Sequence, residues 1–279
     1  MSKTLAVSRY SLLELWRRRI VLVVVLVAVA LVAGTGVVPH AVPGFRTDTD
    51  RTIFILDTLS RLVGLAASLC AYAVGMTIIN HDLESGTAVA LFAKPVSRVG
   101  YALGKLVTAA GLLLAIAALL GGGTILLVAL NGGGHVQVVF WFAAATAANT
   151  VLLLVLLMIL SVYINNIVAA VIVLAFNYVD GVVVTGHTLV QENLITSAPL
   201  QWIVDFFYWA LPHPLYSDLQ RDVVRLQLGT AGPHVTQAMK QQTIERTIAA
   251  SSASDVVFWL GYLAVLCALL VLAVRRKQV

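Results

Sequence analysis

Long apolar runs separated by short polar intervals dominate this chain from residue 20 to its end. A helix needs about 20 mostly apolar residues to cross the hydrocarbon core of a bilayer, and several runs reach that length. The pattern predicts an all-α, polytopic integral membrane protein, a single transmembrane domain over residues 1–279 with about six transmembrane helices. The expected spans are residues 20–38, 53–79, 106–130, 137–160, 167–185 and 256–274.

Two details of this pattern concern breaks in the apolar runs. Residues 137–185 are almost continuously apolar, which is too long for one crossing, so the polar interval 161–166 is the natural turn between the fourth and fifth spans. In the third span, Gly121-Gly122-Gly123 predicts a break in the helix.

The first residues of the chain mix leucines and Trp16 with basic side chains, including Arg17-Arg18-Arg19. Such a mixture in residues 1–19 favours an interfacial helix lying in the headgroup plane. A cleaved signal peptide is the competing interpretation, because a basic start precedes an apolar run. The run 20–38 is long for a signal peptide and suits a span.

Residues 186–255 form the largest segment outside the expected spans. Within it, residues 199–211 are aromatic but short, which favours an interfacial or re-entrant helix over a span. Helical spacing gives this stretch an aromatic face and a polar face. The aromatic face holds Trp202, Phe206 and Trp209, and the polar face holds Gln201, Asp205 and Tyr208. Residues 218–228 and 235–250 predict two further helices.

Charge decides the expected orientation. Charged residues make up 11% of the chain, against about 25% in a soluble domain, so lipid is the main solvent. The net charge of +5 is therefore no argument for nucleic acid, and we expect none as a partner. Most of the 18 Lys and Arg residues fall at the two termini and in residues 80–105, and short basic loops face the cytoplasm. We expect a multi-pass protein of the plasma or inner membrane, with both termini cytoplasmic and residues 186–255 extracytoplasmic.

The interval 80–105 is the one well-populated polar stretch in the first two-thirds of the chain. Asp82 and Glu84 stand at its front and basic residues at its back, an order that favours a short helix because the helix dipole prefers acids first and bases last. Pro95 ends that helix near Lys94, and Ser97 can cap the next one. The interval predicts a small amphipathic helix at residues 83–94, between two spans.

The same interval resembles a known family. Glu84-Ser85-Gly86-Thr87, Lys94-Pro95-Val96-Ser97-Arg98, and then Tyr101 and Gly104-Lys105 are similar to the loop between the first two hairpins of ABC-2-type transporter permeases. In that family this loop carries a coupling helix that sits in a groove of a separate ATP-binding subunit. The resemblance extends more loosely to the spans and the amino-terminal helix, and it fades over residues 186–255. The alternative is an ordinary basic cytoplasmic loop.

The resemblance implies a permease subunit of an ATP-driven exporter that couples to a separate ATP-binding subunit. Two permease chains, identical or different, would pair in the lipid bilayer, and substrate would pass between them. Glu84 and Arg98 would contact the ATP-binding subunit, while Gly86, Pro95 and Ser97 would shape the loop. The residues that the resemblance assigns to coupling are Asp82, Glu84, Gly86, Thr87, Lys94, Pro95, Ser97, Arg98 and Lys105.

The sequence shows no motif for binding a nucleotide or a metal ion, or for catalysis. The stretch from Gly100 to Lys105 comes nearest to a phosphate-binding loop, but it has one residue too few between its glycines and Leu106 where Ser or Thr should hold magnesium. We therefore expect no cofactor in this chain, with ATP and Mg²⁺ on the partner subunit. The histidines lack zinc-ligand spacing, no serine has the glycines of a hydrolase elbow, and no two carboxylates are placed for acid–base work. We expect neither catalytic residues nor a metal site, and an intramembrane enzyme is a minor alternative.

Four polar residues within the spans are candidates for a substrate pathway. Asp57 and Arg61 are one helical turn apart, so their charges can form a plain interfacial pair or contact substrate. Asn177 and Asp180, one turn apart in the outer half of the fifth span, can line a pathway or reach the headgroups.

Two other classes of protein remain open. An ion-gradient-driven secondary transporter would carry carboxylates at mid-membrane and broken helices in matching halves. A membrane scaffold would instead use residues 186–255 to recruit an extracytoplasmic protein.

Overall fold

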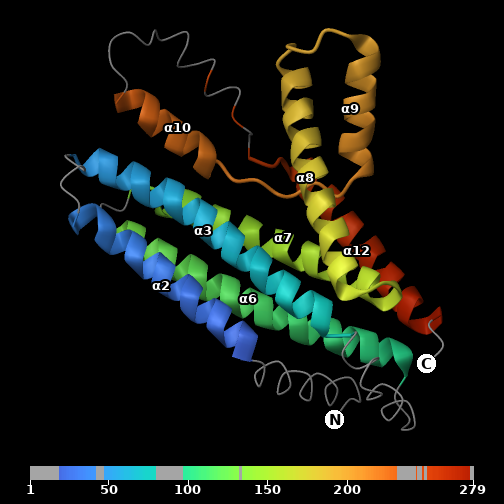
Figure 1. Cartoon of the computed structure of the whole chain (residues 1–279). Coiled ribbons are helices and arrows are strands. Elements are labelled where there is room, and N and C mark those ends of the chain that lie inside the picture. The colour runs from blue at the N-terminus through green and yellow to red at the C-terminus, as the bar shows by residue number, and fades with distance from the viewer. Residues whose placement is uncertain are drawn as a thin grey trace.

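The computed structural model of the protein describes residues 19–41, 47–79, 97–131, 134–230, 243, 247 and 250–276. The main elements in this part of the chain are all α-helices, as the apolar pattern predicts (Figure 1). They are α2 (Arg19–Ala41), α3 (Asp48–Thr77), α6 (Arg98–Leu130), α7 (Val136–Tyr163), α8 (Asn166–Gln191), α9 (Ala198–Ala210), α10 (Leu219–Thr230) and α12 (Ala253–Arg276). The interfacial helix expected at residues 1–19 and the helix expected at 83–94 lie almost wholly or wholly outside the described residues.

Five of the described helices, α3, α6, α7, α8 and α12, are long and apolar enough to cross a membrane. The prediction of a multi-pass helical membrane protein is thereby confirmed. In α2 a shorter apolar stretch, Val25–Val37, is found among the described residues, so the first of the expected spans stays a prediction.

Local capping explains where several helices begin. Thr47 and Asp50 form a reciprocal capping box at the start of α3, with Asp50 N donating to Thr47 Oγ1 at 3.1 Å and Thr47 N donating to Asp50 Oδ2 at 3.2 Å. The helix therefore begins several residues before the expected span. Ser97 Oγ accepts a hydrogen bond from Gly100 N at the start of α6, which confirms the predicted cap. Asn165 caps α8, which confirms the turn expected at 161–166.

The break expected at Gly121-Gly122-Gly123 is wrong, because α6 runs without interruption through these residues. Packing against α7 explains why residue 121 is a glycine. A Cβ atom on Gly121 would lie 2.7 Å from Ala143 Cβ, whereas one on Gly122 would meet nothing within 4 Å. Glycine is thus required at residue 121 for the close approach of two helices and does not end either of them.

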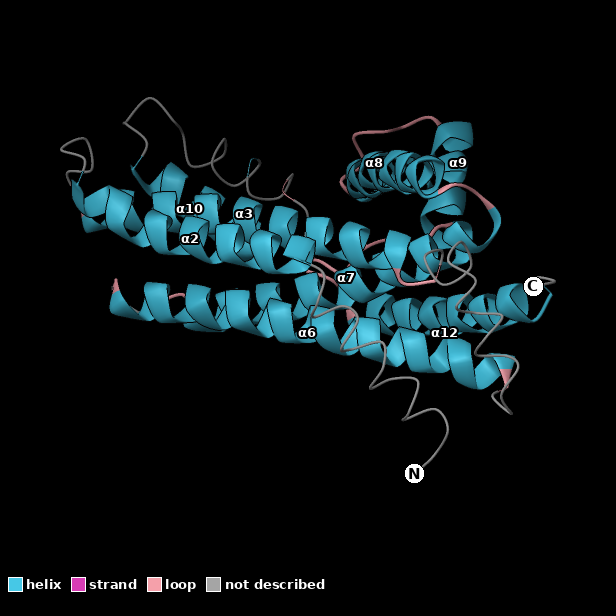
Figure 2. Cartoon of the chain, turned by 60° about the horizontal axis from the view of Figure 1, so that its bottom comes forward, coloured by secondary structure: helices cyan, strands magenta, loops and turns pink. Residues whose placement is uncertain are grey.

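The long helices form a layered bundle in which α7 packs against both α3 and α6. Figures 1 and 2 show α2 beside α3 and α6, and α12 beside α6 and α7 at the end of the bundle where the described chain ends. Side chains between these helices, including Leu59, Leu154 and Leu157, are fully buried. Outward-facing leucines such as Leu65 and Leu126 are exposed, as lipid-facing side chains of a membrane bundle should be.

A hairpin of α8 and α9 stands apart from this layer in both views (Figures 1 and 2). The first part of α8 packs against α7, and α8 then continues beyond residue 185, the expected end of the span, to Gln191 and packs against α9. The predicted faces of α9 are confirmed: Trp202, Phe206 and Trp209 are exposed, while Tyr208 is buried. The helix expected at 218–228 is confirmed as α10, which packs on α3, and most of 235–250 lies outside the described residues.

Candidate functional site

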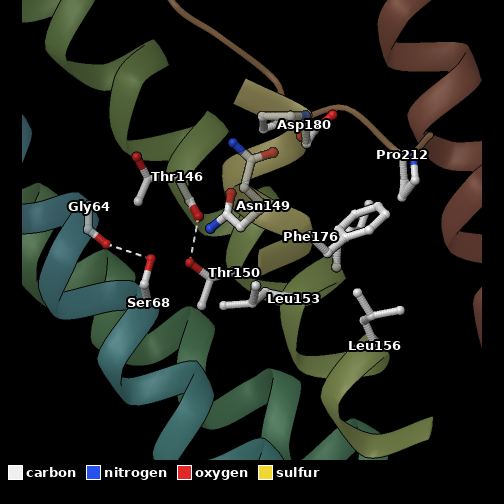
Figure 3. Close-up of a pocket in the computed structure, with 13 residues that line it drawn as sticks. Gly64, Ser68, Thr146, Asn149, Thr150, Leu153, Leu156, Phe176, Asp180 and Pro212 are labelled. Atoms are coloured by element: carbon white, nitrogen blue, oxygen red, sulfur yellow. Dashed lines mark hydrogen bonds between the residues drawn. The ribbon is translucent and has the colours of Figure 1, made fainter. Parts of the chain in front are cut away.

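A pocket of about 190 Å³ lies between α3, α7 and α8, and the segment after α9 contributes part of its wall (Figure 3). Its polar lining consists of Ser68, Thr146, Asn149, Thr150, Asn177 and Asp180. Its apolar lining includes Leu152, Leu153, Leu156, Phe176, Pro212 and Pro214. Thr150 and Asp180 lie near the middle of α7 and α8, and Ser68 lies in the second half of α3, so no residue of this set is at a helix end.

Asp180 is the charged group of this pocket. Its residue surface is only 3% exposed, and its Oδ1 atom is buried with no hydrogen-bond partner among the described residues. Burying an ionised carboxylate without a partner is strongly unfavourable. A proton or a cationic group at Asp180 would relieve this cost.

Two hydroxyl groups in the pocket, those of Ser68 and Thr150, can act only as acceptors toward a ligand. Ser68 Oγ donates to the carbonyl oxygen of Gly64 at 2.8 Å, and Thr150 Oγ1 donates to that of Thr146 at 2.6 Å (Figure 3). A hydroxyl has one hydrogen to donate, and here the helix backbone accepts it. The lone pairs of both oxygens remain to accept a hydrogen bond.

Asn149 shapes the pocket through a pair of hydrogen bonds to one backbone position. Its Nδ2 donates to the carbonyl oxygen of Leu215 at 2.9 Å, and its Oδ1 accepts from Leu215 N at 2.8 Å. This paired bond fixes the segment after α9, which carries Pro212 and Pro214, against the middle of α7. Sequence reasoning missed Ser68, Asn149 and Thr150. The signal was a polar side chain within an apolar run, which in a membrane marks a packing or functional contact.

The four residues predicted to line a pathway divide into two groups. Asn177 and Asp180 both line the pocket. Asp57 and Arg61 pair with each other, with Arg61 Nη2 3.1 Å from Asp57 Oδ1, and the Arg61 side chain is 78% exposed. They do not line the pocket, but they precede Gly64 on the same face of α3, with Asp57 about 10 Å along the axis from Gly64.

Of the residues predicted to couple to an ATP-binding subunit, Ser97, Arg98 and Lys105 are described. Arg98 Nη1 donates to the backbone carbonyl oxygen of Arg275 at 3.0 Å, so the start of α6 and the end of α12 lie at one end of the bundle. Lys105 is fully buried, with Nζ 5.9 Å from the centre of the Tyr101 ring. This burial argues against direct contact between Lys105 and a partner. Outside the described residues lie Asp82, Glu84, Gly86, Thr87, Lys94 and Pro95.

A stack of rings connects the α8–α9 hairpin to α12. The His187 ring stacks on Tyr208 with centroids 3.8 Å apart, Tyr208 stacks on His213 at 4.2 Å, and His213 stacks on Phe258 at 5.1 Å. Carboxylates flank the stack, with Asp205 Oδ1 2.9 Å from His187 Nδ1 and Asp255 Oδ1 3.7 Å from His213 Nε2. No group of three His, Cys, Asp or Glu side chains within the described part of the chain is arranged to hold a metal ion.

Burial sets the protonation of groups near this stack. Burial lowers the pKa of His213, which keeps its imidazole neutral near pH 7. Burial, and then the negative charge of Asp180, raises the pKa of Tyr216, so that its phenol stays protonated. Burial, and then the charge of Asp255, raises the pKa of Tyr208, whose hydroxyl donates to Asp255 Oδ1 at 3.3 Å. Neutral rings of His213 and Tyr208 therefore lie beside the carboxylate of Asp255.

The chain matches no known protein-family model and none of the curated proteins with which it was compared.

Proposed function

We propose that this chain is the membrane-spanning permease subunit of an ATP-driven exporter, of the ABC-2 type that its 80–105 loop resembles. In this proposal two permease chains pair in the bilayer, and separate ATP-binding subunits hold ATP and Mg²⁺ on the cytoplasmic side. The loop residues from Glu84 to Arg98 carry the resemblance. The structure adds a polar pocket that a substrate pathway requires.

The observation that best supports coupling is the connection between this loop and the pocket. The loop joins the end of α3 at Thr77 to the start of α6 at Arg98. Because α3 also contributes Gly64 and Ser68 to the pocket, a displacement of the loop would reach the pocket along one continuous helix. The hydrogen bond from Arg98 to Arg275 would pass the same displacement to α12.

The contact with α12 changes the roles proposed within the loop. Arg98 holds two helix ends together in the isolated chain, so its substitution would affect packing as well as any partner contact. Glu84 is therefore the better residue with which to test direct docking. Substrate would pass along α3 and α8, with both termini in the cytoplasm.

The test is reconstitution of the chain with and without its ATP-binding subunit. We expect background ATPase activity from the purified chain and substrate-stimulated activity from the complex. Glu84→Lys should weaken recovery of the subunit and lower the stimulated rate, since truncating a desolvated charged contact costs roughly 2–5 kcal/mol. Asp48→Lys, at an exposed residue on α3, is the matched charge reversal and should leave both unchanged. Robust ATP turnover by the chain alone, or equal behaviour of both variants, would contradict the proposal.

A second candidate is an ion-gradient-driven transporter, and the buried carboxylate of Asp180 favours it. A buried carboxylate within a membrane-crossing helix, with an oxygen that has no partner among the described residues, is the kind of group that binds a proton or coupling ion in such transporters. Uptake into vesicles that contain the chain alone separates the two candidates. Transport driven by a sodium or proton gradient, without ATP or a second subunit, would favour this candidate.

A further inference from the structure

We propose that the pocket at Asp180 binds the ammonium group of a small amphipathic amine. This inference deepens the proposed function by naming a substrate class. Binding can be measured on the chain alone, so its failure is distinguishable from failure of the coupling to an ATP-binding subunit.

The first step concerns the sign of the charge on the ligand. Among the described residues that line the pocket, Asp180 alone is ionisable; it is 3% exposed, and its Oδ1 lacks a hydrogen-bond partner in the same part of the chain. Two described bases within the spans do not line the pocket: Arg61 pairs with Asp57, and Lys105 is buried beside Tyr101 in α6. A ligand that supplies positive charge relieves the cost of the buried carboxylate, whereas an anion would increase that cost.

The second step is the hydrogen-bonding capacity of the pocket. Ser68 and Thr150 donate their hydrogens to helix carbonyls, and both polar groups of Asn149 are engaged by Leu215. Acceptors therefore remain for a ligand in the carboxylate and in the oxygens of Ser68 and Thr150, while Thr146 and Asn177, which also line the pocket, carry donors as well. An ammonium group has N–H donors and no acceptor, so it complements the carboxylate and the two hydroxyl oxygens.

The third step is size and apolar surface. A pocket of about 190 Å³ is more than ten times the roughly 10–15 Å³ that one water molecule requires. Leu156 and Phe176 lie on the far side of the pocket from Ser68 in Figure 3, and Leu153 lies between them, next to Thr150. These side chains can bury a hydrocarbon or aromatic group, and the Phe176 ring can also face the charge. A bare metal ion would leave this apolar wall unused, and one carboxylate provides a poor site for a divalent ion.

The experiment measures binding of radiolabelled 2-phenylethylamine to the purified full chain in lipid nanodiscs at pH 7. We expect saturable binding that Asp180→Asn weakens at least about tenfold, because truncating a buried charge partner is costly. Asp57→Asn, which removes an ion-paired carboxylate outside the pocket, should bind like the wild type. Excess 2-phenylethanol, which has a similar shape without the charge, should not compete.

A second variant keeps the test independent of Asp180. The double substitution Ser68→Ala and Thr150→Val removes both hydroxyl acceptors but retains the carboxylate, and it should weaken binding by a smaller factor. Thermal unfolding of each variant checks that it remains folded. Absence of saturable binding, competition by 2-phenylethanol, or equal affinity in the Asp180 variant would overturn the proposal. Displacement of the amine by NaCl but not by KCl at equal ionic strength would instead identify an inorganic sodium site and would also overturn it.

Discussion

The side chain of Arg98, at the start of α6, donates a hydrogen bond to the backbone carbonyl oxygen of Arg275, near the end of α12, at 3.0 Å. The last carbonyls of a helix lack partners within that helix, and a guanidinium satisfies one of them while complementing the negative end of the helix dipole. The bond joins the end of the predicted coupling loop to the last span.

Removal of this bond should destabilise the chain even without a partner subunit. We expect Arg98→Ala to lower the free energy of unfolding by about 1 kcal/mol, since the bond is charge-assisted but exposed. Arg276→Ala, which removes an exposed charge next to Arg275, should have a smaller effect. Thermal unfolding of both variants in the same detergent is the measurement. Equal losses would mean that only the charge matters at this helix end.

The effect of an alanine substitution on stability should differ between Gly121 and Gly122. Gly121→Ala places a Cβ atom 2.7 Å from Ala143 Cβ, and overpacking of this kind costs about 1–3 kcal/mol. Gly122→Ala meets nothing within 4 Å and should leave stability unchanged or raise it slightly through helix propensity. Unfolding midpoints of the two single variants make the comparison. If both variants behave alike, the close approach of α6 and α7 at residue 121 is incorrect.

Acidification should weaken the ring stack through His213. Burial lowers the pKa of His213 below its ordinary value of about 6.5. The folded protein then binds fewer protons than the unfolded chain, so stability is greatest above about pH 6.5 and is lost as the pH falls from there toward the folded pKa. His213→Phe keeps a ring between Tyr208 and Phe258 and should show a flatter dependence of the unfolding midpoint between about pH 7 and pH 5. Parallel pH curves for wild type and variant would exclude His213 as the cause.

Orientation in the membrane can be tested by labelling of single cysteines, in a background in which Cys70 and Cys267 are replaced. Thr49 and Gly134, at one end of the bundle, are exposed, and cysteines there should react with an impermeant thiol reagent added to intact cells. Cysteines at Ser85 and Val279 should react only after the cells are opened. Labelling of residue 85 from outside would place the loop on the wrong side for an ATP-binding subunit.

Run length and local capping made much of the fold predictable. In hydrocarbon, backbone groups must be satisfied within the helix, so the long apolar runs from residue 53 onward determined helices of the observed kind. The cap at Ser97 and the turn before Asn165 depend only on neighbouring residues, so both could be predicted from the sequence. The two faces of α9 followed from helical spacing, because Gln201, Asp205 and Tyr208 recur at intervals of three to four residues, as do Trp202, Phe206 and Trp209.

Which side chains meet inside the bundle was decided by the tertiary structure alone. In a helix that is apolar on all sides, periodicity does not distinguish a face that contacts lipid from one that contacts another helix. The burial of Lys105 and Asp180, and the role of Gly121, therefore could not be read from their own segments. Asn149 shapes the pocket through a partner 66 residues away in the chain, and a contact at that separation exists only after the segment that follows α9 has folded back onto α7.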